Sequence, residues 1–178
     1  SAAESALKAA GCEIYAAGLC STPSMYMMTR FPETDCDGSI MVTASHHPAN
    51  RNGLKFFTKS GGIDSADLDK IIAYAGEDKT VAGKETRVLR KEYMKLYKEF
   101  LAKRARELSG KETPLAGMKI CIDAGGGAGG FFASVLEERG ADTSSSQFLE
   151  PDGAFSNHIP NPENPAAMSS LSERVKAT

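Results

Sequence analysis

The residues best suited to chemistry lie in one short polar segment, Thr43-Ala44-Ser45-His46-His47-Pro48. A serine beside a histidine offers a hydroxyl nucleophile and an imidazole that takes or returns its proton. A second segment, Asn52-Gly53-Leu54-Lys55, follows and adds an ammonium group. The residue types therefore allow Ser45 to act as a nucleophile, with His46 or Lys55 managing its proton. A polar turn, in which these side chains only satisfy backbone groups, is the alternative.

The elements around this loop favour a ligand site. Residues 40–43 form a continuous apolar run, which predicts a strand buried on both faces. Residues 54–58 predict the next strand, in which Lys55 points to the face opposite Leu54 and Phe56. Loops at the carboxyl ends of strands in open α/β sheets commonly bind ligands. The segment lacks the G-x-S-x-G pattern, which disfavours a serine hydrolase.

A glycine-rich loop is the second candidate site. Gly125, Gly127 and Gly130 satisfy G-x-G-x-x-G between a predicted strand and a predicted helix. Glu150 follows at about the 20-residue spacing of the dinucleotide-binding fingerprint. A dinucleotide-binding domain is therefore the strongest rival interpretation of the chain. The alternative is structural, because glycines also allow a strand to pass closely into a helix.

A third, weaker candidate is Asp35-x-Asp37-Gly38, which faintly resembles a calcium-binding loop. It lacks a third oxygen ligand and the distal glutamate of an EF-hand. We therefore expect a solvated turn at this position.

The remaining pattern predicts an α/β protein. Strands are expected over residues 12–16, 40–43, 54–58, 118–124 and 142–148. Helices are expected over residues 2–10 (ended by Gly11), 23–31, 65–75, 90–108, 130–139 and from 166 onward. Residues 118–148 form a strand–helix–strand unit, which implies a parallel pair of strands. Residues 109–117 are predicted to be a linker.

Composition excludes several classes of protein. The chain has 178 residues, of which 41% are hydrophobic and 25% charged, as in ordinary folded proteins. Its net charge of −2 creates no general attraction to nucleic acid or to an anionic membrane. No stretch approaches the ~20 apolar residues of a membrane span. We therefore expect neither nucleic acid nor a membrane as a partner.

The cysteines favour an intracellular protein. No C-x-x-C pair occurs, which disfavours a thiolate zinc site. Four scattered cysteines indicate reduced core residues of an intracellular protein, in the cytoplasm or a plastid. They are Cys12, Cys20, Cys36 and Cys121.

Two long segments resemble one enzyme family. The stretch GSIMVTASHHPANRNGLKFF is similar to the active-site loop of the α-D-phosphohexomutases, the phosphoglucomutase and phosphomannomutase family. Their pattern is T-A/G-S-H-N-P followed by N-G-x-K. The stretches IDAGGGAGG, GAD and FLEPDGAFSNHIPNPENPAAM resemble the opening of that family's second domain. Two matches in the right order are more specific than either alone, and they weaken the dinucleotide interpretation.

The resemblance implies a fold and a reaction. The fold would be two partial three-layer α/β/α domains with mixed or parallel sheets, over residues 1–110 and 111–178. Ser45 would carry a phosphoryl group, passing it to a hexose phosphate through a bisphosphorylated sugar and binding Mg²⁺ through its phosphate. Lys55 would assist proton transfer and charge balance, and His46 would position the reacting groups.

The resemblance also implies missing parts and two open points. The aspartate-rich metal loop, D-G-D-x-D-R, is expected after Thr178, and the sugar-reading and phosphate-clamping parts in the remaining domains of the parent polypeptide. The isolated chain is then expected to be inactive, and a non-catalytic scaffold or interaction role is the alternative. His47 replaces the family's usual asparagine with a group that titrates near neutral pH. His158 is expected to be structural, because prolines on both sides fix its backbone.

Overall fold

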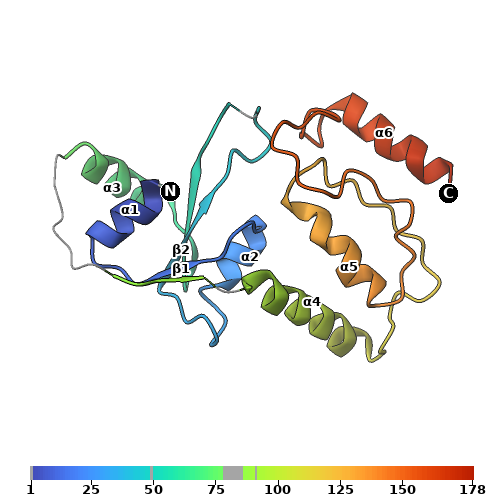
Figure 1. Cartoon of the computed structure of the whole chain (residues 1–178), viewed down its shortest axis with the longest axis horizontal. Coiled ribbons are helices and arrows are strands. Elements are labelled where there is room, and N and C mark those ends of the chain that lie inside the picture. Colours follow the sequence, from blue (N-terminus) through green and yellow to red (C-terminus); the bar gives the residue numbers. More distant parts are fainter. Residues whose placement is uncertain (1, 49, 78–85, 91) are drawn as a thin grey trace. The chain divides into compact units, whose positions relative to one another are not determined.

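The computed structural model describes residues 2–48, 50–77, 86–90 and 92–178. It divides into two compact units. The first combines Ser1–Met41 with Lys55–Tyr93, and the second combines Val42–Leu54 with Met94–Thr178. Figure 1 labels the helices and strands of both units. Helices alternate with a parallel and an antiparallel sheet, which confirms the predicted α/β class.

Three helices belong to the first unit: α1 (Ala2–Ala9), α2 (Thr22–Met27) and α3 (Ser65–Ala75). Helix α1 ends as predicted at Gly11, whose φ of 76° is readily adopted only by glycine. Helix α3 matches its prediction because Asp64 caps it, accepting the Asp67 N–H at 2.8 Å.

Helix α2 is shorter than predicted. It opens as expected, with Ser21 as N-cap and Pro23 in the first turn. Beyond Met27 the chain tightens, because the Arg30 N–H donates to the carbonyl three residues back. The Thr29 hydroxyl also donates to the carbonyls of Tyr26 and Thr58, tying this turn to a neighbouring strand.

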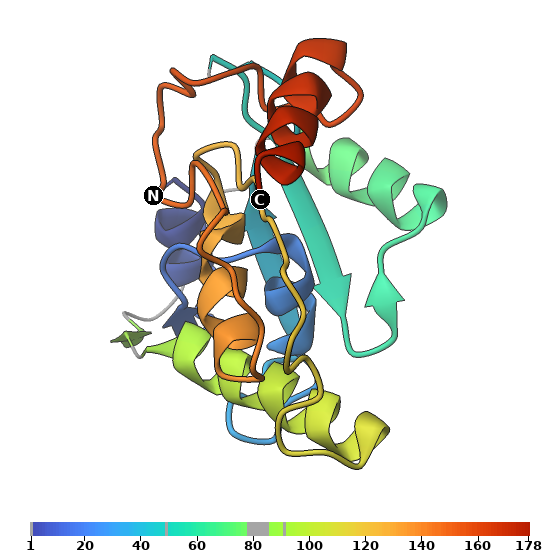
Figure 2. The ribbon, with the colours of Figure 1, turned by 90° about the vertical axis from the view of Figure 1, so that its right-hand side faces the viewer.

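The first unit has two small sheets. Strand β1 (Ile14–Ala16) pairs in parallel with β5 (Val88–Arg90), in the register Ile14↔Val88. The sequence pattern missed β5 and placed Arg90 in a helix, because three residues show no periodicity. The second sheet has the order β2 (Gly38–Val42), β3 (Leu54–Thr58), β4 (Gly61–Gly62), with β3 and β4 antiparallel (Figure 2).

The prediction that β2 is buried on both faces is wrong. Its apolar residues are partly or largely exposed, and its buried residue is Ser39. The Ser39 hydroxyl donates to the Met25 carbonyl of α2 at 2.6 Å, which draws this end of the strand inward.

The last residue of the first unit is Tyr93, which is also the first residue of α4 (Tyr93–Ser109) and is 1% exposed. Its hydroxyl donates to the Ser24 carbonyl of α2, and its ring lies 6.3 Å from that of Phe31. Helix α4 had been predicted over 90–108, and Lys91 of that range lies outside the described residues. The predicted apolar stripe is confirmed at Tyr97, which is buried and whose ring centroid lies 5.9 Å from that of Phe131. It is wrong at Leu108, which is exposed.

The second unit continues through a 3-10 turn η1 (Ala128–Phe131), helix α5 (Phe132–Glu137) and helix α6 (Pro165–Lys176). The two strands predicted around α5 are present as two parallel bridges, Lys119↔Asp142 and Asp123↔Gln147. The second segment has one more residue between the bridges than the first, which makes a bulge. There the Ser146 hydroxyl replaces a carbonyl and accepts the Ile122 N–H at 3.0 Å. The predicted parallel pairing of the two segments is confirmed, and the prediction that they form continuous strands is wrong.

Two predictions about the whole chain concern membranes and thiols. None of the described helices is both long and apolar enough to cross a bilayer. All four cysteines are free, and burial raises the pKa of the Cys20 thiol, which keeps it protonated. Cys12 is exposed, so its predicted place in the core is wrong. It follows Gly11 in the turn that ends α1.

Candidate functional site

The loop Val42–Leu54 is closed by its own backbone. The Thr43 N–H donates to the Gly53 carbonyl at 2.9 Å. A Cβ atom at position 53 would lie 3.0 Å from the Thr43 carbonyl oxygen, so a side chain there would force the two ends apart. Glycine at 53 therefore follows from this close approach.

Ser45 has an unusual backbone conformation. Its φ is 57°, in the left-handed region that residues with a side chain rarely adopt. The Thr43 hydroxyl oxygen holds this turn by accepting the Ser45 N–H at 3.0 Å. The side chain of Ser45 is exposed, so its hydroxyl is accessible. Backbone strain of this kind is concentrated at functional sites, where the surrounding structure maintains it.

Two imidazoles follow the serine in the chain. His46 Nδ1 lies 3.4 Å from the Ser45 hydroxyl oxygen, at the outer limit of a hydrogen bond. The rings of His46 and His47 are 4.9 Å apart at an interplanar angle of 30°. The His47 N–H donates to the Ala44 carbonyl at 3.0 Å, which completes the turn. The structure thus places the imidazole of His46 beside the hydroxyl of Ser45. The predicted roles of these two residues stay a prediction.

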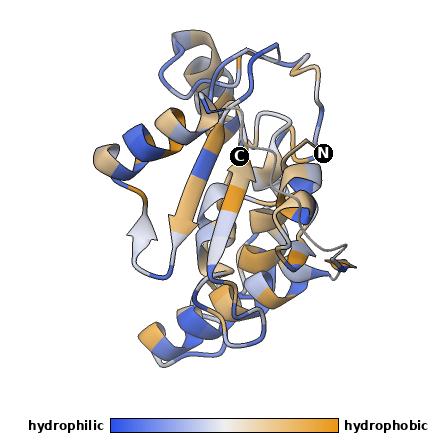
Figure 3. Cartoon of the chain, turned by 90° about the vertical axis from the view of Figure 1, so that its left-hand side faces the viewer, coloured by the Kyte–Doolittle hydropathy of each residue, from blue (hydrophilic) through white to orange (hydrophobic). Residues whose placement is uncertain are grey.

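Lys55, the third predicted residue, lies on β3 in the first unit. It is exposed and is the only charged residue of that strand. Figure 3 shows that the strands carry both hydrophobic and hydrophilic residues. Alternation places Lys55 on the face of Phe57, whose ring lies 5.9 Å from that of Tyr26. Leu54, on the other face, is 52% exposed. Lys55 is therefore free to reach a ligand near the start of β3.

The described residues do not form a metal site. No three His, Cys, Asp or Glu side chains gather within the described ranges. In the predicted turn at Asp35 and Asp37, Lys59 Nζ lies 2.9 Å from one carboxylate and 3.7 Å from the other. The hydrogen bond that Lys59 donates to the Asp35 carboxylate raises the pKa of Lys59. This ammonium group disfavours a second cation there, in agreement with a solvated turn.

The glycine-rich loop uses its amides within the chain. The N–H groups of Gly125, Gly126 and Gly127 donate to the Asp123 carboxylate, the Phe148 carbonyl and the Ala124 carbonyl, respectively. A dinucleotide-binding loop instead needs free N–H groups to hold a pyrophosphate. A Cβ at Gly130 would lie 1.9 Å from the Leu149 carbonyl oxygen, so this glycine has a packing role. The geometry favours the structural alternative for the loop.

Sequence reasoning missed the partners of two residues. Thr43 was not recognised as the acceptor that holds Ser45, although the T-x-S spacing is typical of such turns. His158 was assigned a structural role from its prolines alone. It in fact contacts Asp123, with Nε2 at 3.1 and 3.0 Å from the two carboxylate oxygens.

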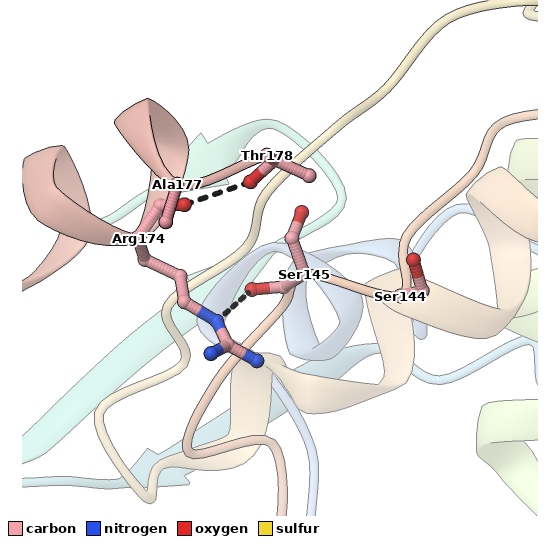
Figure 4. Close-up of a pocket in the computed structure, with 5 residues that line it drawn as sticks. All are labelled: Ser144, Ser145, Arg174, Ala177 and Thr178. Carbon is pink, nitrogen blue, oxygen red and sulfur yellow. Dashed lines mark hydrogen bonds between the residues drawn. The ribbon is translucent and has the colours of Figure 1, made fainter.

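A shallow pocket of roughly 230 Å³ lies elsewhere in the second unit, between residues 144–145 and the end of α6 (Figure 4). Arg174 Nε donates to the Ser145 carbonyl at 2.9 Å, and the Thr178 hydroxyl donates to the Arg174 carbonyl at 2.7 Å. The negative end of the α6 dipole faces this region and opposes anion binding. Nothing in its lining resembles the serine–histidine pair.

Comparison with known proteins decides the family. The model of phosphoglucomutase/phosphomannomutase α/β/α domain I matches residues 1–82. The model of α/β/α domain II of the same family matches residues 91–178. The chain belongs to the phosphoglucomutase/phosphomannomutase family. The boundary predicted at residue 110 stays a prediction.

Relatives and a solved structure agree with this family. Phosphohexose mutases of Xanthomonas campestris are 30% identical over 172 residues, covering 96% of this chain and 37% of the relative. Phosphoglucosamine mutase of Synechococcus elongatus is 33% identical over 158 residues, covering 85% of this chain and 32% of the relative. A phosphoglucomutase/phosphomannomutase family protein of Burkholderia thailandensis superposes with a TM-score of 0.74 at 27% identity, covering 97% of this chain and 37% of that one. The chain spans about a third of the length of the relatives it matches.

Proposed function

We propose that this chain supplies the phosphoserine loop of a phosphohexomutase that interconverts hexose 1-phosphate and hexose 6-phosphate. The observation that carries the proposal is Ser45: an exposed hydroxyl on a left-handed turn, beside an imidazole, in a chain of this family. Ser45 would alternate between its phosphorylated and free forms. The substrate class is an aldohexose phosphate such as that of glucose or mannose.

The chemical step is a phosphoryl transfer in two directions. In the first, the bond between phosphorus and the Ser45 oxygen breaks while phosphorus bonds to a sugar hydroxyl oxygen, whose proton leaves. The serine oxygen ends as a hydroxyl, and the sugar becomes a bisphosphate. After the sugar reorients, the bond between its other phosphorus and the sugar oxygen breaks while that phosphorus bonds to the Ser45 oxygen. Ser45 loses its proton, and the released sugar oxygen gains one and becomes a hydroxyl. Such transfers depend mainly on in-line positioning and charge stabilisation.

The neighbouring residues have separate roles in this proposal. His46, with Nδ1 3.4 Å from the serine oxygen, would orient that oxygen and the group it carries. Lys55 would balance the negative charge that spreads over the transferring group and assist the proton transfer. His47 would supply one hydrogen bond in the place of the family's usual asparagine.

Mg²⁺ belongs to the proposal through the phosphate that Ser45 would carry. When bound, the ion would neutralise charge on that phosphate. Because no three ligating side chains gather among the described residues, these residues do not hold the ion by themselves. The remaining ligands are expected from other domains of the parent polypeptide.

The test of Ser45 is the site of phosphorylation. The complete polypeptide is purified, incubated with isotopically labelled glucose 1,6-bisphosphate and digested, and its peptides are analysed by mass spectrometry. We expect label on the peptide that contains Ser45 and none in a Ser45→Ala variant. Label on another serine, such as Ser144 or Ser145, would contradict the assignment. Native material offers a second test, because the same peptide should already carry phosphate.

The test of the whole reaction is turnover. The complete polypeptide should convert hexose 1-phosphate to hexose 6-phosphate, and the 178-residue chain alone should not. Loss of a single charge-stabilising group commonly costs about 10²–10³-fold in rate, and the chain alone would lack several. If the complete polypeptide binds its partners but turns over neither glucose, mannose nor glucosamine phosphates, the scaffold alternative is favoured instead.

A further inference from the structure

The ring of His158 faces hydrogen-bond acceptors on both sides. Nδ1 lies 2.9 Å from the Ile159 carbonyl oxygen, and Nε2 lies 3.1 and 3.0 Å from the two oxygens of Asp123. A neutral imidazole carries one N–H and leaves a lone pair on its other nitrogen. That lone pair would oppose either the carbonyl or the carboxylate. Only the imidazolium form donates at both nitrogens.

The Asp123 side chain is buried and accepts hydrogen bonds at both oxygens. It is 7% exposed, and each oxygen accepts a further hydrogen bond. The Gly125 N–H donates to one oxygen at 2.8 Å, and Gln147 Nε2 donates to the other at 2.8 Å. Gln147 is itself fixed by the Ser170 hydroxyl of α6 at 3.0 Å. The cost of burying a carboxylate charge is offset best by a positive charge next to it. His158 occupies the place beside the two Asp123 oxygens where such a charge would lie.

The other neighbours of His158 carry no charge. The Phe148 ring lies edge-on at 5.4 Å and 74°, and a Cβ at Gly125 would lie 3.3 Å from the imidazole carbon Cε1. Among the groups that contact His158 in the described structure, Asp123 is the only ionisable one. The His158 side chain is 15% exposed, so water screens the pair weakly.

We propose that Asp123 and His158 form a proton-dependent clamp that fastens the proline-rich segment before α6 to the start of the glycine-rich loop. The two residues are 35 positions apart, so the clamp closes a loop that contains α5 and the second bridged segment, residues 142–147. The clamp forms fully only when His158 is protonated. Its function is conformational, and it is independent of the proposed role of Ser45.

The direction of the pH effect follows from the geometry. The hydrogen bond to the Ile159 carbonyl, followed by the interaction with Asp123, raises the pKa of His158 above its ordinary value, against the effect of burial. The clamp therefore contributes its full stability below the unfolded-state pKa of about 6.5. This contribution is lost as the pH rises through the folded-state value. One proton changes the unfolding equilibrium constant by at most about tenfold per pH unit.

The first experiment compares variants of the full chain by urea unfolding between pH 5.5 and 8.5. The wild type should lose stability with rising pH relative to His158→Gln, which keeps a polar side chain but never a charge. His47→Gln is the matched control, because His47 is an exposed histidine, and it should retain the wild-type pH profile. Parallel profiles for the wild type and His158→Gln would overturn the proposal.

The second experiment does not require a variant to fold. Nitrogen chemical shifts of the His158 ring, measured by NMR in the wild-type chain, should show both nitrogens protonated at pH 6. The midpoint of the His158 titration should lie above that of the exposed His47. A neutral tautomer at pH 6, or a midpoint at or below that of His47, would overturn the clamp. Asp123→Asn should lower the His158 midpoint if the carboxylate is its partner.

Discussion

The loop Val42–Leu54 and the glycine-rich loop around Gly125 are held in opposite ways. The first is exposed, closed by one backbone hydrogen bond, and contains a serine in a strained conformation. In the second, three successive amides, a carboxylate and a histidine are all paired within the chain. Both loops contain residues that suggest ligand binding, and only the first leaves those groups accessible.

This difference teaches that residue types alone do not identify a site. A G-x-G-x-x-G pattern and a buried histidine can serve packing as fully as binding, and the deciding property is which polar groups remain unpaired. The predictions below test this division between a chemical loop and a structural one. Those on turnover apply to the complete mutase that we propose.

The largest effect is expected from Ser45→Ala. Without the hydroxyl there is no oxygen to carry the phosphoryl group, so kcat should fall by at least about 10³-fold. Ser45→Gly is the matched variant, since glycine adopts a φ of 57° without strain. It should lose turnover equally while its melting temperature stays the same or rises. Substantial kcat in either variant would remove Ser45 from the mechanism.

Gly130→Ala should have the next largest effect, on stability. The added Cβ would meet the Leu149 carbonyl oxygen at 1.9 Å, and backbone atoms cannot move aside cheaply. We expect the second unit to lose about 3 kcal/mol, by analogy with severe overpacking. Chemical denaturation followed by circular dichroism measures this loss.

Gly129→Ala is the control for that experiment. Its Cβ would meet only the Ala124 Cβ at 3.9 Å, an ordinary contact. It should therefore remain within about 0.5 kcal/mol of the wild type. If both variants unfold at the same denaturant concentration, the glycine-rich loop is not packed as described.

Lys55→Met should lower kcat/KM by at least about 10²-fold, or about 2.7 kcal/mol, with little change in melting temperature. The substitution keeps most of the side-chain length and removes the charge that we propose balances the transferring group. Lys59→Met is the control, because Lys59 pairs with Asp35 on an exposed turn. Steady-state kinetics give the kcat/KM of both variants and test the role of Lys55. A Lys55→Met enzyme with more than about a third of wild-type kcat/KM would exclude the role.

Much of the fold was predictable, and its exceptions have physical causes. Helix α3 matched its prediction because Asp64 and a long amphipathic pattern act within the segment itself. Strand β5 was missed because three residues contain no period, and its strand form depends on pairing with β1. The bridged segments around α5 were predicted as full strands because the bulge at residues 143–146 leaves no hydrophobic signature.

The sequence was enough to predict which residues form the candidate site, but not which contacts they make. Ser45 and His46 could be identified because they are consecutive residues in the sequence. Thr43 and Asp123 were missed as partners because hydrogen bonds of this kind depend on turns and long-range pairing. The left-handed conformation of Ser45 was likewise not predicted, because the residue there is not the glycine that usually indicates such a turn.

The smallest effect concerns Thr43, which separates positioning from stability within the first loop. Its hydroxyl oxygen accepts the Ser45 N–H at 3.0 Å, so it holds the turn that presents the serine. Thr43→Val keeps the shape of the side chain and removes the acceptor. A hydrogen bond of this kind contributes about 0.5–1.5 kcal/mol, so we expect kcat to fall by up to about tenfold.

Thr43→Ser restores the acceptor and should recover most of the wild-type kcat, while KM changes little in either variant. This pattern distinguishes positioning from folding, because a purely structural role would lower the melting temperature of Thr43→Val and leave the kcat of its folded fraction unchanged. The backbone bond from Thr43 to Gly53 is present in both variants, so the closure of the loop is not altered. If Thr43→Val retained wild-type kcat, the strained turn at Ser45 would have to be maintained by the His47–Ala44 bond and the remainder of the loop instead.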